Sequence, residues 1–353
     1  MEASGNKYAP TLDRFDMTVA HESRTSRHGW VDIAKGICII AVVGLYARND
    51  LETLFGHAGW LDPWSAFARP FRMPDFFLLS GLFLSAVIHR PWRSYLDTKV
   101  AHYAYFLFLW VAILLVYDVA VLGHVEVAGG GAVALLKTYI WKLIYPDHML
   151  WFIQTLPVFF IVTRLLKRVP NWLLWTAAAA AMSSHVKTGF APVDNFNAYY
   201  VFFLSGHFGA PLIHQLAERA RQRPPLTWAL IALWAVLNQL AVSAGLTQVG
   251  GLDLLAGFVG ISAIIALSSL VADVAWLRWL SYAGSNSIVV YLGFFIPLTQ
   301  FTRLVHAYLP GLPMDVVATL SMVVGTAVPL FLYRLVATSH VRFLFVRPSW
   351  ARL

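Results

Sequence analysis

Long apolar runs separated by short polar segments dominate this chain. About 20 apolar residues are enough for a helix to cross the hydrocarbon core of a bilayer. The pattern therefore predicts an all-α, polytopic transmembrane bundle of about ten spans. We expect these spans near 31–48, 73–89, 101–123, 148–166, 171–186, 197–215, 226–244, 251–273, 284–304 and 314–336. The segment 130–145 is shorter and contains two lysines, which favours a helix at the membrane interface.

The composition agrees with a membrane protein and excludes other classes. Hydrophobic residues make up 59% of the chain and charged residues 12%, whereas soluble domains have about 45–50% and 25%. The net charge is +8, but the basic residues are scattered between apolar runs, so we expect no nucleic-acid partner. Cys38 is the single cysteine, which rules out an intramolecular disulfide. We find no P-loop, HExxH, Cys/His metal spacing or GxSxG motif, and we expect no metal site.

The distribution of lysine and arginine predicts the orientation in the membrane. With the N-terminal tail in the cytosol, 18 basic residues lie on the cytosolic side and 7 on the other. This excess follows the positive-inside rule and places both termini in the cytosol. We therefore expect a cytosolic tail at 1–29, a transmembrane bundle at 30–338 and a basic cytosolic tail at 339–353. The segment 49–72 is then the longest outer loop, with aromatic residues that form either an interface belt or a lid.

Ionisable and polar residues mark the first span as a candidate functional element. Asp32 and Lys35 lie near its start, where a charge next to an apolar run is costly and indicates function. Tyr46 follows Lys35 by 11 residues, which corresponds to three helical turns and roughly 20°. Lys35 and Tyr46 are thus expected on one face, about 16 Å apart along the helix.

The second span begins with an unusual polar group. We expect Arg72 and Asp75 at its outer end, three residues apart on one face, where they either form a local ion pair or bind substrate. Pro74 is expected in the first turn, where proline is tolerated. Ser80 and Gly81 indicate either a packing notch, with Ser80 bonded across helices, or a contact with substrate.

Later spans add further candidates. Trp151 near the start of the fourth span is typical of an interface belt. His207 in the sixth span is either a proton-transfer group or a neutral packing histidine. Ser285, Asn286 and Ser287 are predicted to cap the ninth span, where free backbone amides also favour anions. Tyr291 lies deeper in that span, where its phenol needs a partner.

These stretches together resemble the integral-membrane acyltransferase 3 family. The resemblance is carried by DIAKGICIIAVVG, FRMPDFFLLSGLFLS, LWF at 150–152, FFLSGHFGAPLI and GSNSIVVYL, in order along nearly the whole chain. Members of this family have about ten helices and O-acylate glycans, lipid-linked sugars or small molecules. The resemblance implies a multi-pass protein of a bacterial-type inner membrane that uses acyl-CoA, in the simplest case acetyl-CoA, as donor substrate, with no bound cofactor.

Two positions depart from the family pattern. The family has a basic residue in span one followed 11 positions later by a catalytic histidine; Lys35 matches the first and Tyr46 stands at the second. Many members also have a histidine where this chain has Phe294. A phenol, with a pKa of about 10, is a poor base at neutral pH. Tyr46 could serve only if a cation such as Arg48 or Arg72 lowers its pKa; otherwise His207 or His57 takes the role, or catalysis is lost.

The resemblance assigns expected roles to the candidates. The catalytic group comprises Tyr46, Lys35 and His207, and the donor site comprises Asp32, Lys35, Ser285, Asn286 and Ser287. The residues expected to bind the glycan or lipid-linked acceptor are Arg72, Asp75, Ser80, Trp151 and Tyr291. The first alternative is a catalytically lost member that transports or binds an anionic or acylated small molecule. The second is a structural partner in polysaccharide export.

Overall fold

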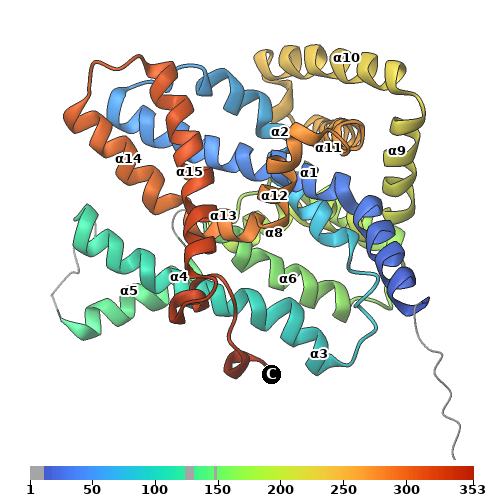
Figure 1. Cartoon of the computed structure of the whole chain (residues 1–353), viewed down its shortest axis with the longest axis horizontal. Coiled ribbons are helices and arrows are strands. Elements are labelled where there is room, and N and C mark those ends of the chain that lie inside the picture. The colour runs from blue at the N-terminus through green and yellow to red at the C-terminus, as the bar shows by residue number, and fades with distance from the viewer. Residues whose placement is uncertain (1–11, 124–130, 147–148) are drawn as a thin grey trace, which may run out of the picture.

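The computed structural model describes residues 12–123, 131–146 and 149–353, with side chains described from residue 29 onward. These residues form helices joined by turns (Figure 1). The helices are α1 (Leu12–Phe55), α2 (Leu61–Leu82), α3 (Trp92–Leu96), α4 (His102–Tyr117), α5 (Ala132–Ile144), α6 (Trp151–Leu165), α7 (Asn171–Ser183), α8 (Ala191–Phe208), α9 (Ala210–Gln222), α10 (Pro224–Ser243), α11 (Leu252–Val271), α12 (Arg278–Ser285), α13 (Ser287–Gly293), α14 (Phe295–Tyr308) and α15 (Met314–Val336).

Each of the ten predicted runs contains helix, but fewer are long and apolar enough to cross a membrane alone. Among the described residues, five helical stretches meet that test: Gly29–Phe55, Trp92–Leu122, Pro224–Ser243, Leu252–Val271 and Met314–Val336. The pair α13 and α14 makes a sixth if its 49° bend is counted within one span. The protein is thus an all-helical membrane bundle in which α2, α6, α7 and α8 are either short or carry charges.

The connection between the first two spans differs from the prediction. Helix α1 continues to Phe55 and α2 already begins at Leu61, so the expected outer loop at 49–72 is almost entirely helical. Pro74 consequently lies inside α2 together with Pro70, and not in its first turn. The polar residues in this stretch explain the error, because they interrupt the apolar pattern although they lie on helical surfaces.

Two further boundaries were wrong. The sixth predicted span, 197–215, combines the end of α8 with the start of α9, because the helix breaks at Gly209 two residues before Pro211. The second predicted span extends to residue 89, but α2 ends at Leu82. The predicted interfacial segment 130–145 does contain a helix, α5.

Glycines bring the central helices into close contact. A Cβ atom on Gly284 of α12 would lie 1.7 Å from the backbone oxygen of Asp32 in α1. Helices α2 and α8 meet in a similar way, since a Cβ on Gly81 would lie 2.1 Å from the oxygen of Phe203, and one on Gly206 would lie 2.0 Å from that of Leu78. Of the two alternatives that the sequence left open for Ser80 and Gly81, the structure thus supports a packing notch at Gly81.

Contacts between helix ends define two ends of the bundle. At the end that includes Lys35, which we call the Lys35 end, the Trp30 ring meets His214 of α9 at 5.9 Å, and Arg221 forms an ion pair with Asp273. At the opposite end, which we call the Asp50 end, Thr299 donates a hydrogen bond of 2.7 Å to Asp50. The predicted alternation of polar segments places these residues on opposite sides of the membrane.

The segment 339–353 packs against the Lys35 end. Arg347 forms a 2.7 Å ion pair with Asp97, and the backbone N–H of Leu353 donates to the same carboxylate. In the second half of α4, the indole N–H of Trp110 donates a 3.0 Å hydrogen bond to the backbone oxygen of Leu344. The C-terminal segment, marked C in Figure 1, is therefore held by specific contacts with the helical stretch 92–122.

Candidate functional site

A partly enclosed cavity lies between α1, α2, α6 and α13. Its volume is about 180 Å³. The lining is mainly apolar, with six residues that carry a polar group on the side chain: Lys35, Ser80, Lys99, Tyr103, Ser287 and Tyr291. Four of these six, Lys35, Ser80, Ser287 and Tyr291, belong to the sequence-predicted site, and Lys99 and Tyr103 do not. The cavity thus brings together residues that lie far apart in the chain.

Two lysines give one end of this cavity a concentrated positive charge. The Lys35 ammonium lies 5.8 Å from the centre of the Phe83 ring, and that of Lys99 lies 4.9 Å from the Phe160 ring. The two ammonium groups are close enough to repel each other, and Arg90 adds a third positive charge near Lys99. Asp32 partly offsets the charge of Lys35. An anion placed between the lysines would relieve this repulsion.

Sequence reasoning missed Lys99. The residue lies in a π-helical turn, Asp97–Ala101, between α3 and α4. Such turns are frequent at functional sites because they redirect side chains from the regular helical spacing. Lys99 is one of the 18 basic residues predicted on the cytosolic side, and its position next to an apolar run indicates orientation only. Its place opposite Lys35 depends on tertiary packing that no local pattern reveals.

The α1–α12 crossing positions the polar residues that follow α12. A Cβ on Gly36 would lie 2.2 Å from the oxygen of Leu280, so only glycine allows this approach. Ser287 consequently lines the cavity with Lys35. The predicted helix cap is wrong, since Ser285 and Asn286 both donate to the oxygen of Tyr282 and make no side-chain cap of α13. These two side chains complete the end of α12.

A second polar group lies beyond Tyr291, toward the Asp50 end. It consists of Tyr46, Arg72, Trp151 and Tyr199, which we call the tyrosine–arginine cluster. Tyr46 hydrogen-bonds with the Trp151 side chain and interacts electrostatically with Arg72. The Trp151 ring stacks on Tyr199 at 5.4 Å. Tyr199 was not predicted, although a phenol within an apolar run generally has a polar partner.

Arg72 and Asp75 have separate environments. Both are buried, and Arg72 donates hydrogen bonds of 3.4–3.5 Å to the Ser65 hydroxyl and backbone oxygen. Asp75 instead accepts a 2.6 Å hydrogen bond from the Cys38 thiol. No Arg72–Asp75 ion pair occurs among the described residues. The predicted local pair is therefore wrong, because both side chains face the interior of the bundle and not its surface.

Comparison with known protein families shows to which family the chain belongs. The family model of the acyltransferase domain, acyltransferase 3, matches residues 28–334. The chain belongs to the acyltransferase 3 family. No curated protein and no solved structure matches the chain. The matched range includes every residue of the cavity and of the tyrosine–arginine cluster, so both features belong to the acyltransferase domain.

Tyr46 and Phe294, the two positions at which the resemblance implies histidine, are neighbours in space. The ring of Tyr46 contacts that of Phe294, with 5.2 Å between ring centres. Phe294 is fully buried. The two positions where the family resemblance implies histidine are thus occupied by one aromatic pair. The pair explains how Tyr46 fits, since the phenol packs on an apolar ring and directs its hydroxyl toward Trp151 and Arg72.

His207 lies in a different cavity of the acyltransferase domain. Its Nδ1 is 2.9 Å from the Ser85 hydroxyl, and it lines a space of about 250 Å³ together with His89 and Lys167. Ser85 and His89 of its lining closely follow Phe83, which contacts Lys35, so this space lies near the Lys35 end, and it does not include Tyr46. We therefore leave His207 out of the proposed site.

Two other residues that the sequence associated with the role of Tyr46, Arg48 and His57, lie in different surroundings. Arg48 pairs with Asp62 at 2.8 Å and with Glu52, at the Asp50 end. His57 is exposed in the short turn between α1 and α2. Ser80 donates to the oxygen of Phe76 in its own helix at 2.7 Å, and not across helices as predicted, while it lines the cavity. Of the two candidate cations, Arg72 is the one whose charge reaches Tyr46.

Proposed function

We propose that this protein is a membrane O-acyltransferase that takes an acyl group, most simply acetyl, from a CoA thioester. The acceptor is a hydroxyl of a glycan or lipid-linked sugar. The observation that carries the proposal is the cavity between α1, α2, α6 and α13, which has two lysines at one end and leads to Tyr291 at the other. An elongated donor with a polyanionic head and a reactive tip fits this distribution of charge.

In this proposal, the residues at the two ends have different tasks. Lys35 and Lys99 bind donor phosphates by charge-assisted hydrogen bonds, with Ser287 as a further donor. Tyr46, Trp151 and Arg72 hold the acceptor and the thioester carbonyl, because phenol, indole and guanidinium groups all donate hydrogen bonds. Donors directed at a carbonyl oxygen stabilise the negative charge that develops there during acyl transfer.

The reaction exchanges one ester for another. The acceptor oxygen forms a bond to the acyl carbon, the bond from that carbon to sulfur breaks, and the hydroxyl proton ends on the CoA thiol. No oxidant or reductant is required.

Blocking the cavity tests this function. Full-length protein in proteoliposomes is supplied with radiolabelled acetyl-CoA and envelope glycan or lipid extracts, and both thiol release and labelled product are measured. Ser80→Phe is expected to lower both by about 100-fold, because misplacing a bound reactant by an ångström can cost that much. Ser94→Phe makes the same change at an exposed position of α3 and should leave both unchanged. Equal rates for the two variants would contradict the proposal.

The Tyr46–Phe294 pair favours a second candidate function. With an aromatic pair at the two positions implied to carry histidine, the same cavity would bind an anionic or acylated small molecule without turning it over. This candidate predicts donor binding by the parent protein and no thiol release above that of Ser80→Phe. It differs from the transferase in one measured quantity, the parent rate of thiol release.

Restoring histidine at both positions is expected to raise acetyl-CoA turnover. Y46H/F294H should gain about 10²–10⁴-fold in thiol release over the parent, the range that a positioned general base supplies. Y46H alone should gain less, because the Phe294 ring would still pack against the new imidazole. Tyr46→Phe serves as the control for loss of the hydroxyl. The absence of any gain in the double variant would show that proton transfer does not take place at position 46.

A further inference from the structure

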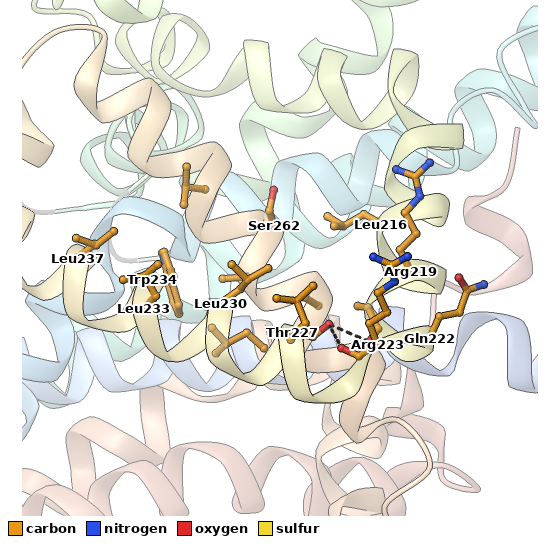
Figure 2. A pocket seen from close by; sticks show the side chains of 16 residues that line it. Leu216, Arg219, Gln222, Arg223, Thr227, Leu230, Leu233, Trp234, Leu237 and Ser262 are labelled. Carbon is orange, nitrogen blue, oxygen red and sulfur yellow. Dashed lines mark hydrogen bonds between the residues drawn. The ribbon is translucent and has the colours of Figure 1, made fainter.

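A third and larger hollow lies on the side of the bundle, between α9, α10 and α11. This groove has a volume of about 740 Å³. In Figure 2, Leu230, Leu233, Trp234 and Leu237 follow one another along α10, whereas Arg219, Gln222 and Arg223 gather at one end. None of these residues lines the cavity between α1, α2, α6 and α13 that contains Lys35.

Short side chains on α11 create the groove. Val259, Ser262, Ala263 and Ala266 face it, at the spacing of three and four residues that places side chains on one helix face. On the opposite flank, Leu230 and Leu233 remain about half exposed, at 55% and 54%. Trp234 closes part of the space by packing on Phe67 and Phe71 of α2, with 5.4 Å between ring centres in each case.

The groove faces the hydrocarbon of the membrane. Helix α10 is long and apolar enough to span, yet only 11% of its apolar window is buried inside the protein. From Arg223 to Leu237 it rises by roughly 21 Å at 1.5 Å per residue. Half of a bilayer's hydrocarbon core measures about 15 Å. The groove therefore extends from the Lys35 end of the bundle past the depth of one leaflet.

The charged end of the groove has cations without matching acids. Arg219 and Arg223 are exposed, and neither forms an ion pair with a residue in the described ranges. Arg221, between them in sequence, instead pairs with Asp273. The Thr227 hydroxyl fixes the α9–α10 turn by hydrogen bonding at 3.0 Å to the oxygens of Ala220 and Arg223. The turn therefore places Arg219 and Arg223 at one end of the apolar groove.

We propose that this groove binds one anionic phospholipid, with its phosphate at Arg219 and Arg223 and an acyl chain along α10 and α11. Guanidinium groups recognise phosphate by paired, charge-assisted hydrogen bonds. A second copy of the chain is a poorer occupant, because a two-fold symmetric contact through this face would bring the same arginines of both copies together. The lipid site is independent of the acyl-transfer cavity, and its test requires no catalytic activity.

Lipid retention by the purified full-length chain tests the proposal. The protein in detergent is incubated with equal amounts of phosphatidylglycerol and phosphatidylcholine, and bound lipid is counted by native mass spectrometry. We expect one retained phosphatidylglycerol, with a preference over phosphatidylcholine that falls by about tenfold or more in R219Q/R223Q, since each basic side chain near anionic lipid contributes substantially to binding. Arg221→Gln, on the same helix but outside the groove, should keep the preference.

A second pair of variants tests the acyl-chain trough. Ser262→Trp fills the groove without changing its charge and should abolish retention, whereas Ala232→Trp, exposed on α10 outside the groove, should not. A phosphatidylglycerol with a photoreactive acyl chain should label peptides of α10 and α11. The proposal is overturned by equal retention of the two lipids or by an unchanged preference in R219Q/R223Q. Labelling of peptides outside α10 and α11, or purification of the chain as a dimer that retains no phospholipid, would overturn it as well.

Discussion

Gly284→Ala is expected to prevent assembly of a stable bundle. The added Cβ would lie 1.7 Å from the oxygen of Asp32 and 2.6 Å from the nitrogen of Gly36, both backbone atoms of α1 that cannot rotate away. Separating α12 from α1 would also move Ser287 away from Lys35. Overpacking of this kind costs on the order of 3 kcal/mol of unfolding free energy. Thermal stability and monodispersity in detergent, measured by fluorescence-detected size exclusion, provide the test.

The matched control for this substitution is Gly311→Ala. Gly311 lies in the turn before α15, and a Cβ added there would have no neighbour within 4 Å. Its melting temperature should equal that of the parent protein. A G284A protein as stable as G311A would mean that the α1–α12 crossing is looser than the structure describes.

Removing the two cavity lysines is expected to abolish use of the donor. A hydrogen bond to a charged group contributes about 1.5–3 kcal/mol, which corresponds to roughly 10–150-fold in binding. Lys35→Ala and Lys99→Ala should each raise the KM for acetyl-CoA within that range, and the double variant should show no saturation. Acetyl-CoA binding measured by calorimetry gives the same comparison if the protein binds without turnover.

Lys167→Ala is the control for loss of a lysine at the same end of the bundle. Lys167 lines the separate cavity with His207 and should leave the KM unchanged. An equal effect of Lys167→Ala and Lys99→Ala would show that a diffuse positive surface, and not the paired lysines, attracts the donor. His207→Ala in the same background would show whether that second cavity takes part.

Much of the helical architecture follows from local patterns in the sequence. The ten apolar runs each contain helix, and the glycine beside Ser80 does allow close approach to another helix. The predicted placement of Lys35 and Tyr46 on one helix was also informative, since Lys35 lines the cavity and Tyr46 belongs to the tyrosine–arginine cluster. These features depend on helical spacing and on the cost of polar groups among apolar ones, both of which are local.

Other features depend on packing between distant segments and could not be predicted. Asp75 finds Cys38, 37 residues earlier, instead of its near neighbour Arg72. Lys99, in a π-helical turn, lines the same cavity as Lys35, 64 positions earlier in the chain. The polar residues after Asp50 predicted a loop. Asp62 and Arg72 instead belong to helix α2, where their side chains contact other parts of the bundle. In each of these cases, the position of the side chain depends on a residue from a distant segment, which the local sequence does not reveal.

The continuity of α1 sets a fixed distance for the proposed chemistry. Lys35 and Tyr46 belong to one unbroken helix. The two residues therefore stay about 16 Å apart along the helix axis. The helix thus fixes the distance between the proposed binding site for the donor phosphates and the proposed site of acyl transfer. A donor anchored at Lys35 must itself supply a slender arm that spans this length, which the pantetheine chain of CoA provides. A compact donor such as acetyl phosphate would be held at the lysines with its acyl group far from Tyr46.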